Sequence, residues 1–380
     1  MAIKICGNTI IPNLTGCNTT SGNISVGISN LSSLTTGTYN TAIGSSALLS
    51  NTAGSNNFAA GYQPLYCNTT GVNNSAIGYQ ALYNNTIGSN NFAQGYKTML
   101  NNTIGKDNVA IGCNALYNNT TGCNNTAIGY QSLNNNTTGY NNIAIGCLTL
   151  FGNTSGYNNT AQGYKALRCN TTGSNNVAIG ACSLYNSNAT GSNIAIGYCA
   201  GANLTTGINN VIIGGYTVAA GPLNATSSNT VVLADGAGNI KQVIDSSGNV
   251  GIGLGATLPS YKLHVVGSFA ATTKSFVIDH PTKEGMKLRY GSLEGPENGV
   301  YVRGRLDGDK VINLPDYWEG LVDLDTITVN LTAIGHSQNL YVSGIDGLKI
   351  HIDTENHTQP YCFYHVYGER KDVDKLVVEF

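Results

Sequence analysis

A repeat of 17 residues fills the first half of the chain and constrains its fold more than any other feature. Its most constant residue, named here the register glycine, recurs twelve times: Gly27, Gly44, Gly61, Gly78, Gly95, Gly112, Gly129, Gly146, Gly163, Gly180, Gly197 and Gly214. An asparagine stands four residues before every register glycine, from Asn23 to Asn210. Because 17 residues are too few for a pair of helices, we expect each repeat to form one short strand and a bend.

The residue types within the repeat also indicate strands. A short segment rich in Val, Ile and Thr precedes each register glycine, and a turn rich in Asn, Thr and Gly follows it. Alanine occupies ten of the twelve positions two residues before the register glycine, and leucine dominates four residues after it. Stacked at about 4.8 Å per coil, the repeats predict a β-roll or β-solenoid shaft roughly 55–60 Å long. We expect the register glycines to adopt positive φ at the bends.

Stacking places like residues above one another, so the asparagine column predicts a ladder of side-chain amides along the shaft. We expect each amide to donate to the next coil and to accept from the previous one. Nine residues are assigned to this structural ladder: Asn40, Asn57, Asn74, Asn91, Asn108, Asn125, Asn142, Asn159 and Asn176. Asn119 lies outside this column, so we expect its replacement to destabilise the fold less than the replacement of Asn125.

The apolar content of one coil is small. One Ile, one Leu and one Ala per repeat bury little surface compared with the conformational entropy lost by 17 ordered residues. Backbone and amide hydrogen bonds offset only part of that loss. We therefore expect several copies of the chain to associate and to give each coil a second apolar face.

Composition excludes several function classes. Charged residues make up 10% of the chain and the net charge is −2, so no bulk electrostatic attraction recruits nucleic acid or anionic lipid. No apolar run has the roughly 18 residues of a membrane helix, and the first residues do not read as a signal peptide, so we expect no membrane insertion and no export. The ten cysteines fit no metal spacing, and we expect free thiols, including Cys182 and Cys199 in one register on adjacent coils.

The shaft also lacks the residues of an enzyme. Glycoside hydrolysis needs two carboxylates roughly 5–10 Å apart. Residues 1–240 contain only Asp107 and Asp235, and they are 128 positions apart, so we predict no catalytic, cofactor or metal site there. Gln94 and Gln162 replace the usual Ile before the register glycine. They form either an axial polar ring that binds an ion or fixes chain register, or they face a solvated groove.

From about Phe269 the sequence changes to short alternating segments separated by Gly, Asp and Pro turns, which is typical of a small antiparallel β-sandwich. Asp279 and His280 are a possible acid–base couple, but no nucleophile motif accompanies them. His351, Asp353 and His357 are a possible metal set, although scattered histidines on a sheet are usually solvated or hydrogen-bonded. We predict neither catalysis nor metal binding, and an all-β chain throughout.

The stretch Asp316-Tyr317-Trp318-Glu319 has two interpretations. If it is exposed, Tyr317 and Trp318 offer ring faces on which sugars stack, and Glu319 offers an acceptor, so these three are the candidate receptor-binding residues. Alternatively, the single Trp of the chain is the core anchor of the small β domain.

Three segments resemble a known group of proteins. The repeats "NNTAIGYQSL" and "NNSAIGYQAL" resemble the head repeats of trimeric adhesins and phage-type fibres, which form left-handed β-rolls joined as homotrimers. The stretch "GNVGIG" with "KLHV" after it is similar to the connector of tail-fibre proteins. The segments "KSFVIDHPTKEGMKLRYGSLEGPENGVYVRGRL" and "LPDYWEGLVDLDTITVNLTAIG" resemble a C-terminal domain of fibre-like structural proteins in marine cyanobacterial viruses.

The repeat and the resemblance together predict four regions. These are an N-terminal segment (1–22), twelve β-roll repeats (23–216), a connector or neck (217–268) and a C-terminal β-rich tip domain (269–380).

The resemblance implies a homotrimeric, non-enzymatic virion fibre, made in the host cytoplasm. It implies contacts with tail or capsid proteins of the particle, and attachment to a glycan or protein of a bacterial, and specifically a cyanobacterial, surface through multivalent contacts. One alternative is a bacterial trimeric surface adhesin, which needs an export signal and a membrane anchor. The other is a tip enzyme that acts on surface polysaccharide.

Overall fold

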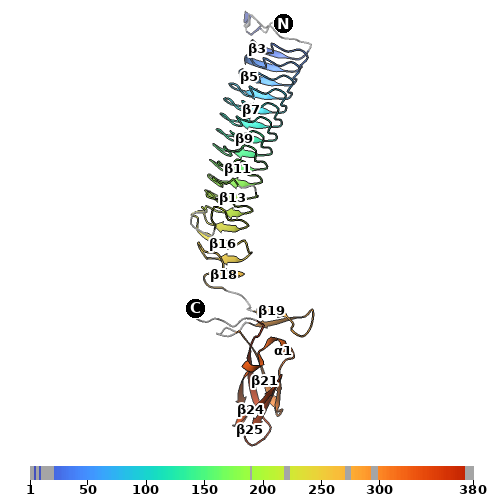
Figure 1. Cartoon of the computed structure of the whole chain (residues 1–380), viewed down its shortest axis with the longest axis vertical. Coiled ribbons are helices and arrows are strands. Elements are labelled where there is room, and N and C mark those ends of the chain that lie inside the picture. The colour runs from blue at the N-terminus through green and yellow to red at the C-terminus, as the bar shows by residue number, and fades with distance from the viewer. Residues whose placement is uncertain are drawn as a thin grey trace. The chain divides into compact units, whose positions relative to one another are not determined.

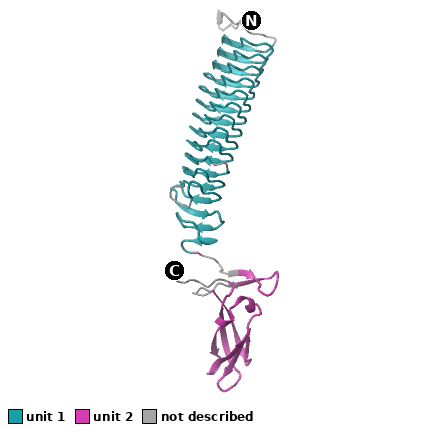
Figure 2. Cartoon of the chain, in the orientation of Figure 1, with its two compact units in different colours: residues 1–268 teal, residues 269–380 magenta. Residues whose placement is uncertain are grey.

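The structure is a computed structural model, and it describes the chain in two compact units, residues 1–268 and 269–380 (Figure 2). The described residues are 4–5, 8–9, 21–188, 191–217, 223–269, 275–291 and 298–372. Most of the N-terminal segment predicted for 1–22 lies outside them. Its two described pieces, β1 (Lys4–Ile5) and β2 (Asn8–Thr9), form an antiparallel pair.

Each 17-residue repeat contributes one strand to a single stacked sheet, as Figure 1 shows. The strands are β3 (Ile24–Ile28), β4 (Thr41–Ser45), β5 (Phe58–Tyr62), β6 (Ser75–Ile77), β7 (Phe92–Gln94), β8 (Val109–Ile111), β9 (Thr126–Ile128), β10 (Ile143–Ile145), β11 (Thr160–Gln162), β12 (Val177–Ile179), β13 (Ile194–Ile196) and β14 (Val211–Ile213). Neighbouring strands are parallel and in register, so that Ala127 pairs with Ala144 and Ala144 with Ala161. The predicted repeat solenoid is confirmed.

The stretch predicted as a connector continues this sheet. Strand β15 (Val231–Ala234) adds to β14 in parallel, β16 (Ile240–Ile244) and β17 (Val250–Ile252) follow in antiparallel pairing, and β18 (Leu263–Val265) is again parallel to β17. The antiparallel steps need only tight turns, and the Asp235 carboxylate forms one of them by accepting from the backbone N–H groups of Ala237 and Asn239.

The core of the shaft is a spine of two stacked columns. The central Ala of each strand from β4 to β13 is completely buried, and so is the residue four positions after each register glycine from Gly44 to Gly180. The latter column contains Leu48, Leu65, Leu82, Met99, Leu116, Leu133, Leu150, Leu167 and Leu184. These residues hold φ between 47° and 52°, in the left-handed region that Leu rarely adopts. Because each coil lies hydrogen-bonded between two others, as Leu65 N–H does to Ala81 O at 3.0 Å, the stack enforces this conformation.

The register glycines have the predicted positive φ, for example 129° at Gly129. A Cβ there would lie 2.5 Å from the carbonyl oxygen of Gly146 on the next coil, so both the dihedral angle and the space require glycine. A second glycine, ten residues after the first, is required by space alone. At Gly122 a Cβ would lie 2.3 Å from the side-chain oxygen of Asn119.

The C-terminal unit is antiparallel. One sheet contains β21 (Gly299–Asp307), β26 (Tyr361–Glu369) and β23 (Thr328–Ala333), and the other contains β22 (Val311–Asn313), β25 (Lys349–Thr354) and β24 (Leu340–Asp346). A hairpin of β19 (Ser275–Asp279) and β20 (Lys287–Gly291) precedes them, and α1 (Trp318–Leu321) and η2 (Leu324–Thr326) connect β22 to β23. One apolar cluster joins both sheets and α1, with Val300, Ile312, Trp318, Ile350 and Val366 among its members.

Candidate functional site

The predicted asparagine column forms a continuous buried ladder. Asn125 Nδ2 donates to Asn108 Oδ1 (3.2 Å) and to the carbonyl oxygen of Gly139 (2.8 Å), and its backbone N–H donates to the same Asn108 oxygen (2.9 Å). All nine assigned residues, from Asn40 to Asn176, make both bonds to the preceding coil. The expected direction is therefore wrong: each amide donates to the previous coil, because that coil's side-chain oxygen already faces the backbone N–H.

A second buried asparagine column runs beside the glycines of the turn. Asn119 Nδ2 donates to Asn102 Oδ1 (2.7 Å) and to the carbonyl oxygen of Gly122 (3.0 Å), and Asn119 is completely buried. The column comprises Asn51, Asn68, Asn85, Asn102, Asn119, Asn136, Asn153 and Asn170. Asn119 lies outside the first column, as expected, but it belongs to a second column that is equally buried, and the expected smaller effect of its replacement stays a prediction. The signal was present, because an Asn stands seven residues after eight successive register glycines.

The outer side of the shaft sheet, named here the strand face, is apolar and exposed in the single chain. It consists of the first and third residues of each strand and the residue after the register glycine, as the exposed residues Ile143, Ile145, Tyr62 and Tyr79 illustrate. Ile143 keeps 42% and Ile145 keeps 37% of its surface accessible. An apolar face repeated on successive coils is unusual for a monomer and typical of a surface that contacts another protein.

Gln94 and Gln162 both lie on the strand face and are exposed. Each belongs to a coil that also has a lysine beside its tyrosine. The ammonium group of Lys97 lies 5.4 Å from the ring centre of Tyr96, and the ammonium group of Lys165 lies 4.7 Å from that of Tyr164. A polar ring of Gln94 or Gln162 requires further copies of the chain, so the two interpretations stay predictions.

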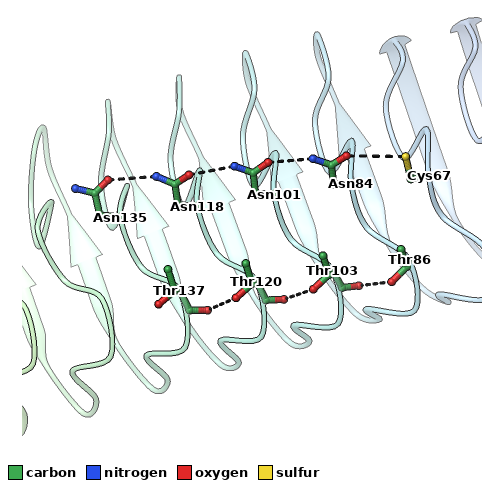
Figure 3. Close-up of a pocket in the computed structure, with 9 residues that line it drawn as sticks. All are labelled: Cys67, Asn84, Thr86, Asn101, Thr103, Asn118, Thr120, Asn135 and Thr137. Carbon is green, nitrogen blue, oxygen red and sulfur yellow. Dashed lines mark hydrogen bonds between the residues drawn. The ribbon is translucent and has the colours of Figure 1, made fainter.

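A polar groove, named here the ladder groove, crosses five coils of the shaft (Figure 3). Its volume is 690 Å³, and it is lined by two columns: Cys67, Asn84, Asn101, Asn118 and Asn135 in one, and Thr86, Thr103, Thr120 and Thr137 in the other. The amide of Asn101 donates to Asn118 Oδ1 at 3.0 Å, and the hydroxyl of Thr103 donates to the carbonyl oxygen of Thr120 at 3.0 Å. No lining residue is charged. None of the candidate site residues predicted from the sequence lies in this groove.

The three candidate receptor-binding residues, Tyr317, Trp318 and Glu319, are not all exposed. Trp318 is completely buried in the core of the C-terminal unit, so it cannot stack on a sugar, and the prediction is wrong for this residue. Its ring fills the volume that one large side chain can supply to a small β core. Tyr317 is half-buried, with its ring edge-on to His280 at 5.9 Å, and only Glu319 is exposed. The three side chains do not form one surface.

The possible catalytic and metal residues of this unit are engaged in other contacts. Asp279 pairs with Lys287, and the His280 ring is buried with its Nδ1 near the backbone N–H of Thr282. Asp353 binds Lys310 Nζ and His357 Nδ1, each at 2.9 Å, and the Lys310 ammonium holds the pKa of Asp353 well below its usual range.

His351 is not part of the Asp353 contact. Within the described residues no group of three or more His, Cys, Asp or Glu side chains has the arrangement of a metal site. The structure therefore joins Asp353 with His357, and His351 lies outside this pair.

A second surface feature lies on the C-terminal unit and is named here the arginine surface. It is a cavity of 380 Å³ lined by Arg303, Gly304, Arg305, Phe363 and His365. Strand pairing places Arg303 opposite His365 and Arg305 opposite Phe363 on β21 and β26. Arg305 Nε also donates to Asp307 at 2.6 Å. The alternation in "VYVRGRL" was the available signal, because two residues two apart in a strand share a face.

The cysteines that the structure describes are free thiols, and Cys6 and Cys17 lie outside the described residues. Within the described parts of the chain, no helix has the length and apolar character to cross a membrane. No protein-family model, curated protein or solved structure matches this chain. Its function is therefore inferred from its own residues.

Proposed function

We propose that this chain is a structural fibre protein of a bacterial virus, with a solenoid shaft that assembles from several copies and a C-terminal unit that attaches to the host surface. The observation that carries this proposal is the strand face, an exposed apolar surface repeated along a shaft whose two buried asparagine columns are hydrogen-bonded from coil to coil. Such a surface suits contact with another protein chain rather than catalysis.

The partner of the strand face is a second and a third copy of this chain. Most coils present apolar side chains in the same columns at the same spacing, so identical shafts match along their length. In a homotrimer around a common axis, the Gln94 and Gln162 side chains of three chains meet as polar rungs in an otherwise apolar contact. A shift of one coil would place them against Ile, leaving buried amides without partners, so these rungs favour one register.

Assembly is tested with one charged substitution and a matched control. Ile145→Lys places a charge on the strand face and should reduce the assembled fraction, because burying unpaired ammonium groups is costly. Ile104→Lys, at an Ile that is 48% exposed on a different column, should assemble normally. Sedimentation velocity measures both. Equal behaviour of the two variants would contradict the proposed interface.

Attachment is assigned to the arginine surface, in place of the Tyr317–Glu319 stretch. Two guanidinium groups with an exposed Phe suit a carboxylate or sulfate on a surface glycan. Adsorption of labelled protein to cyanobacterial cells should fall for the pair Arg303→Ala and Arg305→Ala. Lys349→Ala removes an exposed cation from the other sheet and should adsorb normally. If the unmodified protein does not adsorb to any host tested, the attachment role is wrong.

A further inference from the structure

We propose that the ladder groove binds a linear, uncharged polysaccharide that lies along the shaft, one sugar ring to each coil. This proposal rests on the proposed attachment function for its biological setting, and it adds a second contact site and the chemical class of its ligand. The argument uses only the groove lining shown in Figure 3.

The groove offers regularly spaced hydrogen-bonding capacity that the ladders leave unused. The Thr103 hydroxyl has one hydrogen and donates it to the carbonyl oxygen of Thr120, so its lone pairs are left to accept. The Asn101 amide has two hydrogens and uses one for Asn118 Oδ1. Each coil therefore presents one fixed acceptor and one fixed donor. A sugar hydroxyl can donate to the first while another accepts from the second.

The spacing of these groups suits a polymer. Asn and Thr line the groove together on four coils spaced at about 4.8 Å, so their three coil steps span roughly 14 Å. Each pyranose ring of an extended glycan advances by a length close to one coil spacing, and these coils thus hold roughly four rings. The asparagine column ends on one side at Cys67, whose Sγ lies 3.9 Å from Asn84 Oδ1, and on the other where Gly152 follows Asn135.

The same lining disfavours other polymers. It contains no cation to neutralise phosphates, so nucleic acid and acidic polysaccharides lack their main attraction. It contains no large apolar pocket for the anchor residues of a peptide. The backbone is also unavailable for strand addition, because Thr103 N–H already donates to Thr120 O at 3.1 Å. A neutral chain of repeated hydroxyls is the class that remains complementary.

The groove is prearranged for such a ligand. Each lining asparagine is held by its neighbour, Asn84 to Asn101 at 3.0 Å and Asn118 to Asn135 at 3.2 Å. The side chains therefore lose little rotamer freedom when a ligand binds, which lowers the entropic cost of weak contacts. Contacts repeated over the four coils that carry both Asn and Thr, and over every copy in an assembly, then sum to useful avidity.

The test is titration calorimetry of the full chain with cello-, xylo- and manno-oligosaccharides of increasing length, and with malto-oligosaccharides, whose chains are curved. We expect affinity for an extended series to rise with each ring until the groove is filled and then to level off. Malto-oligosaccharides should bind more weakly, because a curved chain cannot follow the coils. The pair Asn101→Ala and Asn118→Ala should weaken binding by about tenfold or more.

The control is Asn186→Ala, in the same column of the repeat but beyond the groove, and it should bind like the unmodified protein. The proposal is overturned if no extended series binds, or if the groove pair and Asn186→Ala bind alike.

Cell adsorption separates this failure from that of the proposed function. If cells adsorb the unmodified protein and the groove pair equally and no extended series binds in the titration, the groove proposal falls and the attachment role stands. If cells adsorb neither, the attachment role falls, and the calorimetric titration still decides the groove.

Discussion

The shaft and the C-terminal unit solve the problem of a stable core in opposite ways. The shaft buries a narrow spine of Ala and Leu and surrounds it with two columns of completely buried asparagines, each hydrogen-bonded to the coil before it. The C-terminal unit places Trp318 and aliphatic side chains between two short sheets. Directional polar contacts therefore specify the shaft, whereas shape and volume specify the other unit.

The difference has a functional consequence. In a repeat stack every coil sees the same neighbours, so one satisfied hydrogen-bond pattern serves all coils and the outer residues are free to vary. The shaft can then present an apolar strand face on one set of columns and a polar ladder groove on another. The C-terminal unit has no such redundancy, and its arginine surface depends on the pairing of two particular strands, β21 and β26.

The largest expected effect is a loss of folding stability that is confined to the shaft. Gly112 has φ of 131°, and a Cβ there would lie 2.6 Å from the carbonyl oxygen of Gly129. Gly112→Ala should therefore destabilise the shaft by about 4 kcal/mol or more. Gly236→Ala, at a glycine with open space around its Cβ position, should cost less than about 1 kcal/mol. Differential scanning calorimetry measures both, and equal costs would contradict the stacking argument.

The next effect breaks the C-terminal unit alone. Trp318→Ala removes a completely buried ring from the core and should cost about 3–5 kcal/mol in that unit. The shaft transition should stay where it is, because the two units are separately compact. Calorimetry should show a lower transition temperature for the C-terminal unit and an unchanged transition temperature for the shaft. A shift of both would mean that the two units are coupled.

A smaller effect is expected from substitutions of two neighbouring asparagines in one coil, which should differ in how much stability they remove. Asn119→Ala removes three buried hydrogen bonds, those from Asn119 Nδ2 to Asn102 Oδ1 and to the Gly122 carbonyl oxygen and that from Asn136 Nδ2 to Asn119 Oδ1, and should cost about 2–3 kcal/mol. Asn118→Ala removes a partly exposed member of the groove ladder and should cost at most about 0.5–1 kcal/mol. Chemical denaturation of the two variants measures the difference. A larger loss of stability for Asn118→Ala than for Asn119→Ala would show that the buried asparagine columns do not dominate the stability of the shaft.

The smallest effect is a difference in acid sensitivity. Lys310 and His357 depress the pKa of Asp353 in the folded C-terminal unit. A depressed pKa adds stability above the unfolded value of about 3.9, and this stability is lost as pH falls through the folded value. The shaft repeats 23–216 contain one carboxylate, Asp107, so acid should lower the melting temperature of the C-terminal unit more than that of the repeats. Melting curves from pH 7 to pH 2 test this order.

Much of the shaft could be predicted from the sequence because its physics is periodic. The 17-residue interval fixed the strand positions, and the Asn before each register glycine indicated a ladder, since stacking must superimpose like residues. The second column was missed because Asn119 sits in an Asn-rich turn, where the residue also serves ordinary turn chemistry. The left-handed leucines were not predictable from propensity, because only the neighbouring coils enforce that conformation.

The candidate sites were less predictable, because they depend on burial and on neighbours distant in sequence. Trp318 in a polar stretch reads equally well as a ligand platform or as a core anchor, and only packing decides between them. The ladder groove needs the coil path to bring Asn101 and Thr103 onto one surface with their counterparts on other coils. The arginine surface needs the pairing of β21 with β26.

The mass of the native assembly tests the central claim most directly, namely that copies of this chain cover the strand face that each leaves exposed. Native mass spectrometry of the full-length protein should give three chains of 39.7 kDa, or about 119 kDa. A single species of 39.7 kDa, stable at micromolar concentration, would contradict it.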